Sequence, residues 1–315
     1  MNVQGVPVIS IADLNDPATL AELDGACRDW GFFQVVEHGV DKSVTGAIQG
    51  AMHQFFEQPL EVKRRILRTA ENPWGYFDQE LTKNTRDWKE VYDYGPASGD
   101  VLRPQWPEGL PGFSEAVLDF YGAAQKLAFE LLGALSVNLG MPEDYLESGF
   151  GPEHSSFLRL NHYPPCPEPA RPVGLNPATG GHLGVNHHTD AGALTILLQD
   201  RQPGLEVFRH GRWHLVEPRE GALVVNIGDI VQVWSNDRYR ASLHRVTANT
   251  TARRFSAPFF LNPSYSADYA PLPTTFDARH PARYRAINWG EFRSQRAAGD
   301  YADLGEEVQI SHYRI

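Results

Sequence analysis

The spacing of apolar residues changes near residue 155 of the chain. Before that point the clearest pattern predicts a helix over residues 113–139, because apolar side chains recur there at steps of three and four. Gly140 and Pro142 follow this pattern as a stop signal. The apolar stripe is broad, which predicts a buried helix that supports the rest of the fold.

The N-terminal part of the chain alternates short apolar runs with helical patterns. Residues 6–11 predict a short strand, and Asp13 or Asn15 is the expected cap of the helix that follows. A second strand is expected over residues 31–36, and then another helix. The remainder, up to about residue 112, is polar and rich in turn residues.

After residue 155, short β-rich runs follow one another without helical patterns between them. Strands are expected at residues 157–163, 194–198, 205–208, 213–216, 222–227, 230–234, 242–247 and 255–261. Closely spaced short strands predict an antiparallel sandwich or barrel. Helical character returns around residues 289–295, in a segment that either covers the mouth of the barrel or packs as a simple C-terminal helix.

The length of 315 residues would allow about two domains, although all-β barrels of ~200–250 residues often form one. We expect an N-terminal α/β region at 1–112, packed on a core at 113–280 that contains the supporting helix and the barrel. The last part, 281–315, is expected to be a helical segment that could act as a lid.

Charge and cysteine content narrow the class of protein. The 28 Lys and Arg residues stand against 39 Asp and Glu, so the net charge is -11 and nucleic acid is not an expected partner. Cys27 and Cys166 are too few for a disulfide framework or a thiolate zinc site, which fits a reducing compartment. The N-terminus has no signal-peptide pattern, and no apolar run reaches the ~18 residues of a membrane span. We therefore expect a cytoplasmic protein without membrane contacts, and a monomer by default.

The first candidate metal ligands are His188 and Asp190. In a strand, residues two apart point to the same face, so this imidazole and this carboxylate would converge. Such a pair suits a divalent metal of intermediate softness. A His-x-Asp triplet alone is nevertheless also typical of solvated loops.

His244, on a much later expected strand, would complete a set of two histidines and one carboxylate. That set leaves about half of the positions of an octahedral iron open for small ligands. A structural zinc site would instead be closed by about four protein ligands. Taken alone, His244 could equally be a hydrogen-bonded core residue.

Two further strands offer polar pairs with the same spacing. Arg254 and Ser256 share a face, and a guanidinium beside a hydroxyl is a good receptor for a carboxylate. A salt bridge to an internal acid is the alternative for Arg254. Asn161 and Tyr163 share a face of an earlier strand and can hydrogen-bond a dicarboxylate and a metal-bound oxygen, or else serve only the structure.

Taken together, these motifs resemble the plant-type 2-oxoglutarate/iron(II) dioxygenases, the superfamily that also holds isopenicillin N synthase. The resemblance covers most of the chain. It includes Asn-His-Tyr-Pro-Pro-Cys at 161–166, His-Thr-Asp at 188–190, His244, Arg-Phe-Ser at 254–256 and the N-terminal motifs Pro-Val-Ile-Ser at 7–10, Gly-Phe-Phe-Gln-Val at 31–35, His-Gly-Val at 38–40 and Asp-Trp-Lys-Glu at 87–90. Two residues depart from the pattern: Glu37 replaces a frequent Asn, and the residue before His188 is a second histidine.

The resemblance implies a double-stranded β-helix, or distorted jelly roll, that is mainly β with packed helices. It implies Fe(II) bound by His188, Asp190 and His244, with 2-oxoglutarate as co-substrate. Residues that match the family's co-substrate site are Arg254, Ser256, Tyr163 and Asn161. The implied reaction uses O2 to hydroxylate, desaturate or cyclise a small organic molecule, with succinate and CO2 as co-products.

Two other functions remain open at this stage. The first is an Fe(II) oxidase of the isopenicillin N synthase type, which does not consume 2-oxoglutarate. The second is a non-catalytic jelly-roll protein that binds a metal only for structure. The substrate itself is not predicted, and Phe77, Tyr92, Phe259 and the C-terminal segment are candidates for its pocket.

Overall fold

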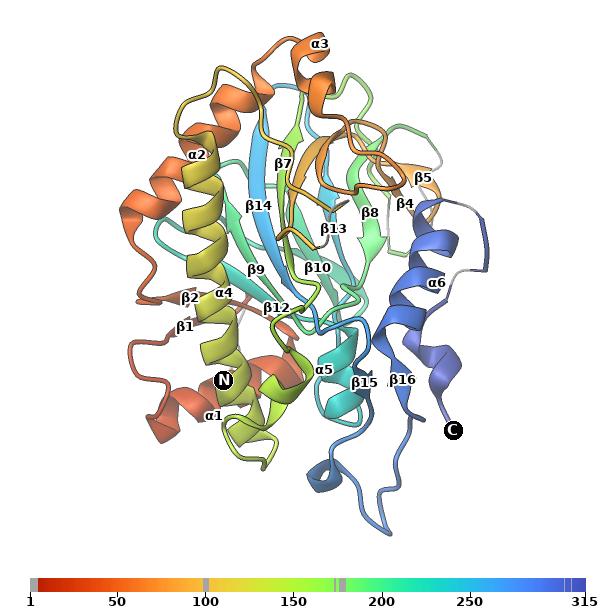
Figure 1. Cartoon of the computed structure of the whole chain (residues 1–315). Coiled ribbons are helices and arrows are strands. Elements are labelled where there is room, and N and C mark those ends of the chain that lie inside the picture. The colour runs from red at the N-terminus through yellow and green to blue at the C-terminus, as the bar shows by residue number, and fades with distance from the viewer. Residues whose placement is uncertain (1–4, 99–101, 173, 176–179, 303, 307) are drawn as a thin grey trace.

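Two β-sheets form the body of the protein in the computed structural model (Figure 1). The structure describes residues 5–98, 102–172, 174–175, 180–302, 304–306 and 308–315. The larger sheet has the strand order β1-β2-β12-β9-β14-β7-β6-β3. These strands are β1 (Val8–Ser10), β2 (Phe32–Val36), β3 (Gly75–Phe77), β6 (Glu90–Tyr94), β7 (Phe157–Tyr163), β9 (Leu194–Gln199), β12 (Leu223–Ile227) and β14 (Arg254–Leu261).

The smaller sheet has four strands in the order β11-β10-β13-β8. They are β8 (Leu183–His188), β10 (Leu205–Arg209), β11 (Arg212–Leu215) and β13 (His244–Thr247). Two short hairpins complete the β-structure: β4 (Leu81–Thr82) with β5 (Thr85–Arg86), and β15 (Asp268–Tyr269) with β16 (Ile287–Asn288). Strands β1 and β2 pair in parallel. The other pairs formed between the named strands are antiparallel.

The helices lie mostly on one side of the larger sheet (Figure 1). They are α1 (Pro17–Asp29), α2 (Lys42–Phe56), α3 (Leu60–Lys63), α4 (Phe113–Asn138), α5 (Asp229–Trp234) and α6 (Trp289–Tyr301). Short 3-10 turns occur at Arg64–Ile66, Tyr145–Gly149, Pro273–Thr275 and Ile310–Tyr313. No helix among the described residues is long and apolar enough to cross a bilayer.

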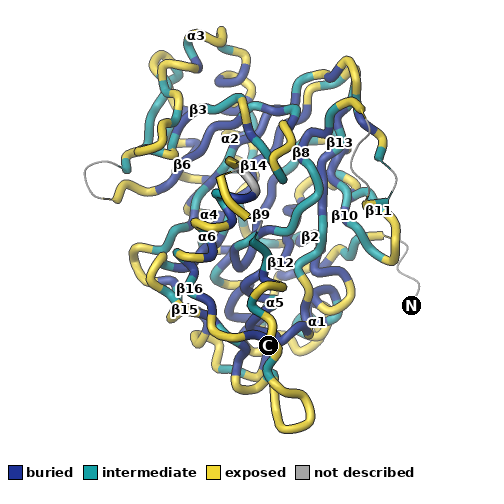
Figure 2. Tube along the Cα trace, turned by 90° about the vertical axis from the view of Figure 1, so that its right-hand side faces the viewer, coloured by how far each residue is buried: buried dark blue, intermediate teal, exposed yellow. Residues whose placement is uncertain are grey.

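The long helix α4 is the supporting helix that the apolar pattern predicts. Its residues Val117, Phe120 and Leu132 are fully buried in the main core, together with strand residues such as Ile196 and Phe259. Helix α6 lies apart from α4. In Figure 2 it lies in front of the sheets, and exposed and buried residues alternate along it. Its position sets one wall of the cavity described below.

Most expected elements are confirmed, including the strand at 157–163 and the helix that begins at Phe113. Two expectations are wrong, and one stretch contains strands that its composition does not indicate. The run 230–234 lies in helix α5, since a short, mostly apolar run does not distinguish a buried strand from a buried helix. The cap of α1 is Asp16, whose side chain accepts from the amide of Ala18. The polar stretch before residue 112 contains the strands β3 to β6.

Candidate metal centre and its cavity

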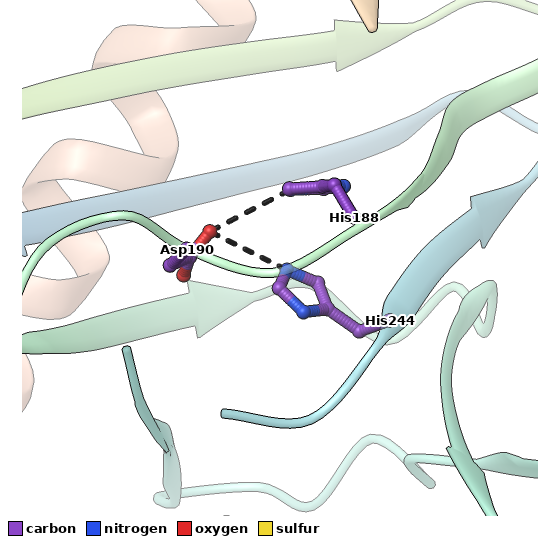
Figure 3. A group of neighbouring side chains, drawn as sticks. All are labelled: His188, Asp190 and His244. Atoms are coloured by element: carbon purple, nitrogen blue, oxygen red, sulfur yellow. Dashed lines mark ion pairs between the residues drawn. The ribbon is translucent and has the colours of Figure 1, made fainter. Parts of the chain in front are cut away.

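The side chains of His188, Asp190 and His244 point toward one another (Figure 3). Their ligand atoms all lie within 4.8 Å of one another. The Asp190 Oδ1 atom is 3.5 Å from His188 Nε2 and 3.6 Å from His244 Nε2. The strand alternation that predicted this convergence applies only in part, because β8 ends at His188 and Asp190 lies in the turn beyond it.

Each imidazole is oriented by a backbone carbonyl. His188 Nδ1 lies 2.9 Å from the carbonyl oxygen of Asn186, and His244 Nδ1 lies 3.1 Å from that of Ser242. An Nδ1–H that donates to a carbonyl places the lone pair on Nε2, the atom that faces Asp190. The extra histidine, His187, lies on the other side, with its ring 6.4 Å from that of Trp213, so the register is the predicted one.

The two oxygens of Asp190 have separate roles. Oδ2 accepts hydrogen bonds from Thr195 Oγ1 at 2.5 Å and from Asn226 Nδ2 at 2.8 Å, whereas Oδ1 faces the two histidines. Thr195 lies on β9 and Asn226 on β12, the neighbouring strands of the larger sheet. The carboxylate is therefore held in one orientation, with a single oxygen free to bind a cation. Neither of these two partners was predicted from the sequence.

The electrostatic environment suits a divalent cation. Burial alone would raise the pKa of Asp190, but His244, His188 and Asn226 stabilise the carboxylate, and its pKa lies well below the ordinary value. Burial lowers the pKa of His244 to about 4, and the neighbouring His188 adds to this effect. At neutral pH the site therefore contains a carboxylate beside a neutral His244, the protonation states that metal ligands need.

Arg254 lies deeper in the same cavity and is 1% exposed. Its Nη2 donates to Gln199 Oε1 at 3.3 Å, but its Nε and Nη1 atoms have no hydrogen-bond partner. Among the described residues no carboxylate forms a salt bridge with it within 4.0 Å, and Asp200 interacts with it only at longer range, so Arg254 lacks the close internal ion pair that could have explained it. A buried guanidinium with unmet donors is costly unless an anion binds it.

Ser256, Asn161 and Tyr163 surround this guanidinium, as strand alternation predicts. Strands β14 and β7 pair Ser256 with Asn161 and Arg254 with Tyr163. Asn161 Nδ2 donates to Ser256 Oγ at 3.4 Å, while its buried Oδ1 has no partner. The Arg254 guanidinium lies 5.0 Å from the centroid of the Tyr163 ring. The four predicted residues thus line one cavity with the three candidate metal ligands.

The cavity has a volume of about 300 Å³. Of the expected substrate-pocket residues, the C-terminal segment is confirmed as part of the wall, through Trp289, Arg293 and Ala297 of α6. Phe77, Tyr92 and Phe259 do not line it. Tyr92 and Phe259 are fully buried in the core, and Phe77 packs beneath the Arg68 guanidinium at 3.8 Å. The aromatic residues that do line the cavity include Phe157 and Phe260.

Two family models match the chain. The model of the 2OG-Fe(II) oxygenase superfamily matches residues 154–263, and the model described as non-haem dioxygenase in morphine synthesis N-terminal matches residues 6–109. The chain is also 35% identical over 298 residues to flavanone 3-dioxygenase 2 of Oryza sativa subsp. japonica, an alignment that covers 91% of this chain and 82% of that protein. The chain belongs to the 2-oxoglutarate/Fe(II) oxygenase superfamily.

Solved structures of this superfamily share the fold. The structure of JOX2 in complex with 2OG, Fe and JA has a TM-score of 0.83 at 30% identity, covering 99% of this chain and 89% of that chain. A full-length Neurospora crassa protein, solved in complex with alpha-KG and thymine, has a TM-score of 0.80 at 26% identity, covering 95% of this chain and 98% of that chain. These likenesses confirm the predicted double-stranded β-helix.

Membership of the superfamily confirms the predicted class of enzyme: an oxidoreductase that uses Fe(II), 2-oxoglutarate and O2. The residues present fit both groups. The histidine and carboxylate atoms form a donor set for Fe(II) that leaves coordination positions open. The unmet donors of Arg254 fit the far carboxylate of 2-oxoglutarate.

Proposed function

We propose that His188, Asp190 and His244 bind the Fe(II) ion, and that Arg254, Ser256, Tyr163 and Asn161 bind 2-oxoglutarate. The substrate is then a small organic molecule held in the outer part of the same cavity. Bound Fe(II), 2-oxoglutarate and O2 together supply the oxidising chemistry, in which oxidation of a substrate C–H bond is coupled to formation of succinate and CO2.

The observation that carries this proposal is the state of Arg254. Its side chain is almost completely buried, faces the cavity of the two histidines and has two nitrogens without acceptors. A dicarboxylate that reaches the iron with its keto-acid end would place its other carboxylate at this guanidinium. A closed structural metal site has no use for such a receptor, which argues against the non-catalytic alternative.

The remaining groups position the co-substrate. Ser256 Oγ and Asn161 Nδ2 already lie within hydrogen-bonding distance of each other beside Arg254, so little reorganisation is needed when a carboxylate binds. The Tyr163 hydroxyl is available as a further donor. The apolar residues Val185, Leu197 and Val246 complete the wall and exclude water from the bound dicarboxylate.

The small-molecule substrate is proposed from the size of the cavity and from the relatives. The JOX2 structure contains JA together with 2OG and Fe, and the Neurospora crassa structure contains thymine together with alpha-KG. A cavity of about 300 Å³ is at the lower end of the range for small-ligand sites, which is ~300–1,000 Å³. A compact molecule fits such a site better than a polymer does.

The proposal is tested by replacing Arg254 with methionine. Arg254→Met removes charge-assisted hydrogen bonds of about 1.5–3 kcal/mol each, so 2-oxoglutarate should bind at least tenfold more weakly. Calorimetry under argon should show Fe(II) affinity unchanged. Without ligands the variant should be as stable as the wild type or more stable, because it no longer buries unmatched donors. Unchanged 2-oxoglutarate affinity would contradict the assignment.

A second experiment separates this enzyme from an oxidase of the isopenicillin N synthase type. Succinate and O2 are measured together during turnover. A 2-oxoglutarate-dependent oxygenase forms one succinate for each O2 consumed, whereas the oxidase consumes O2 without forming succinate. Arg201 is exposed and pairs with Glu220 at the surface, so it offers a control for replacing an arginine by methionine. Arg201→Met should change neither the succinate formed nor the O2 consumed.

A further inference from the structure

A second part of the cavity wall, on β7 and the segments next to β4 and β6, contains a buried network of charged side chains. Arg159 on β7 contacts Asp93 at 2.7 Å and Glu80 at 2.5 Å. Arg68 contacts the same two carboxylates, at 2.5 Å for Glu80 and 3.2 Å for Asp93. Two cations and two carboxylates thus satisfy one another.

Lys89 belongs to this wall but is satisfied much less well. Its side chain is 5% exposed, and among the described residues its ammonium has one ion pair within 4.0 Å, with Asp87 Oδ2 at 3.3 Å, while Glu80 interacts with it at longer range. That carboxylate already accepts from Thr82 Oγ1 at 2.8 Å and, through Oδ1, from the Asn186 amide at 3.1 Å. An ammonium carries three N–H donors, so Lys89 retains donors for another acceptor.

The network presents its positive side to the cavity. Lys89, Arg68 and Arg159 line the cavity, whereas Glu80 alone among the three carboxylates of the network reaches the wall. The charges of Arg68 and Arg159 are balanced by Glu80 and Asp93, and that of Lys89 by Asp87. What this wall offers an anion is therefore the remaining N–H donors of Lys89.

The anion at Lys89 is not 2-oxoglutarate if the proposed function is right. Arg254 lies on β14, whereas Lys89 directly precedes β6, two strands away in the same sheet, and is also held against β8 of the smaller sheet through Asp87 and the backbone of Asn186. Backbone contact between Trp88 and Leu183 at 2.9 Å fixes the same segment. His188, two residues beyond Asn186, lines the cavity together with Lys89. A molecule bound at Lys89 therefore shares the cavity with the candidate iron site.

We propose that the substrate is a compact organic carboxylate whose charged group binds Lys89, with its oxidisable carbon directed to the iron. This inference rests on the proposed function and specifies its substrate class. Lys89 acts as the binding residue for the substrate anion. The rest of the ionic network keeps the ammonium in place and contributes no further free charge.

The test compares acids with their methyl esters. Phenylacetate, cinnamate, cyclohexaneacetate and 1-naphthaleneacetate are titrated by calorimetry, each beside its ester, into the enzyme loaded with Fe(II) and 2-oxoglutarate under argon. We expect at least one acid to bind tenfold or more tightly than its ester. Binding next to the iron should also perturb the visible absorption of the iron–2-oxoglutarate complex.

The variants are chosen so that misfolding cannot imitate the result. Lys89→Met alone would leave Asp87 as an unpaired buried carboxylate, so the test uses the double variant Asp87→Asn with Lys89→Met, which removes both charges. It should lose the preference for acids to within twofold and should retain ester binding. Lys89→Arg should keep the preference. Lys126→Met, at a side chain 80% exposed on α4, is the matched control and should behave as the wild type.

Fe(II) and 2-oxoglutarate affinities of all these variants should match the wild type. If the wild type does not bind 2-oxoglutarate, the proposed function is refuted. That outcome is distinct from failure of the substrate proposal. The substrate proposal is overturned if esters bind the wild type as tightly as acids, if the double variant keeps the preference, or if none of the acids binds.

Discussion

The guanidinium of Arg296 lies 2.6 Å from the carboxylate of Asp229, and their side chains are 1% and 2% exposed. Arg296 also donates to the backbone oxygen of Thr189 at 2.9 Å. Thr189 stands between the candidate ligands His188 and Asp190, and the amide of Asp229 donates to the backbone oxygen of Asp190 at 2.8 Å. One buried arginine of α6 therefore connects the C-terminal helix to the loop that carries the metal site.

Loss of this arginine should destabilise the whole fold. Arg296→Met leaves Asp229 as an unpaired buried carboxylate, which is expected to lower the free energy of unfolding by about 3–5 kcal/mol. Urea denaturation measures the change. The double variant with Asp229→Asn should recover most of it. Arg65→Met is the control, because its side chain is 66% exposed and its ion pair with Glu108 spans 4.0 Å, so it should cost at most about 1 kcal/mol.

The partners of the Asp190 carboxylate should control iron affinity. Asn226→Leu and Thr195→Val each remove a donor to Oδ2 and allow the carboxylate to rotate. Replacement of such outer partners typically weakens metal binding about 10–100-fold. Calorimetric titration of Fe(II) under argon measures the effect. Gln125→Leu, at a polar residue of α4 that contacts His154 at 2.7 Å, should leave iron affinity unchanged. Equal Fe(II) affinities in the wild type and in the Asn226, Thr195 and Gln125 variants would show that Asp190 Oδ2 does not need these donors.

The proposed site was largely predictable because strand periodicity is simple. Residues two apart on β14 share a face, so Arg254 and Ser256 could be placed together, and the same rule continues to Pro258 and Phe260. Phe259 is one position out of this alternation, so its side chain faces the core. The prediction that it lines the substrate pocket is therefore wrong.

Other features depend on contacts between distant residues and could not be read locally. Strand β6 looks polar because it contains Asp93, whose charge is neutralised by Arg68 and Arg159, 25 and 66 residues away along the chain. Similarly, nothing near Asp190 in the sequence indicates that Asn226 will hold its carboxylate. The charge of Lys89 was visible in the sequence, but its burial in the cavity wall was not.

Gly228 is expected to tolerate no side chain. A Cβ at this position would lie 2.2 Å from the Gly192 oxygen and 2.8 Å from the Asp190 oxygen, both of which belong to backbone. Gly228→Ala should therefore displace the loop of Asp190, with a loss of stability of about 1–3 kcal/mol or more and weaker Fe(II) binding. Gly25→Ala is a suitable comparison, since nothing lies within 4 Å of its Cβ position in α1 and alanine should stabilise the helix by about 0.5–1 kcal/mol. Wild-type stability in Gly228→Ala would show that the loop adapts without cost.

Glu80 should make stability depend on pH in the acidic range. Burial would raise its pKa, but Arg159, Arg68 and Lys89 outweigh this and lower it from 4.5 to about 2. The unfolded chain therefore binds a proton at Glu80 more readily than the folded protein does. The stabilisation from Glu80 is complete above pH 4.5 and is lost as the pH falls toward 2.

Glu80→Gln removes this titrating group, so the variant should be less stable than the wild type near neutral pH. The difference in unfolding free energy should shrink as the pH falls from about 5 to about 3, because the wild-type carboxylate loses its advantage over that range. Urea titrations at several pH values measure it, with exposed Glu153→Gln as the control for general charge effects. If the difference stayed constant down to about pH 3, the arginines would not be what keeps Glu80 ionised, and the ionic wall would need another explanation.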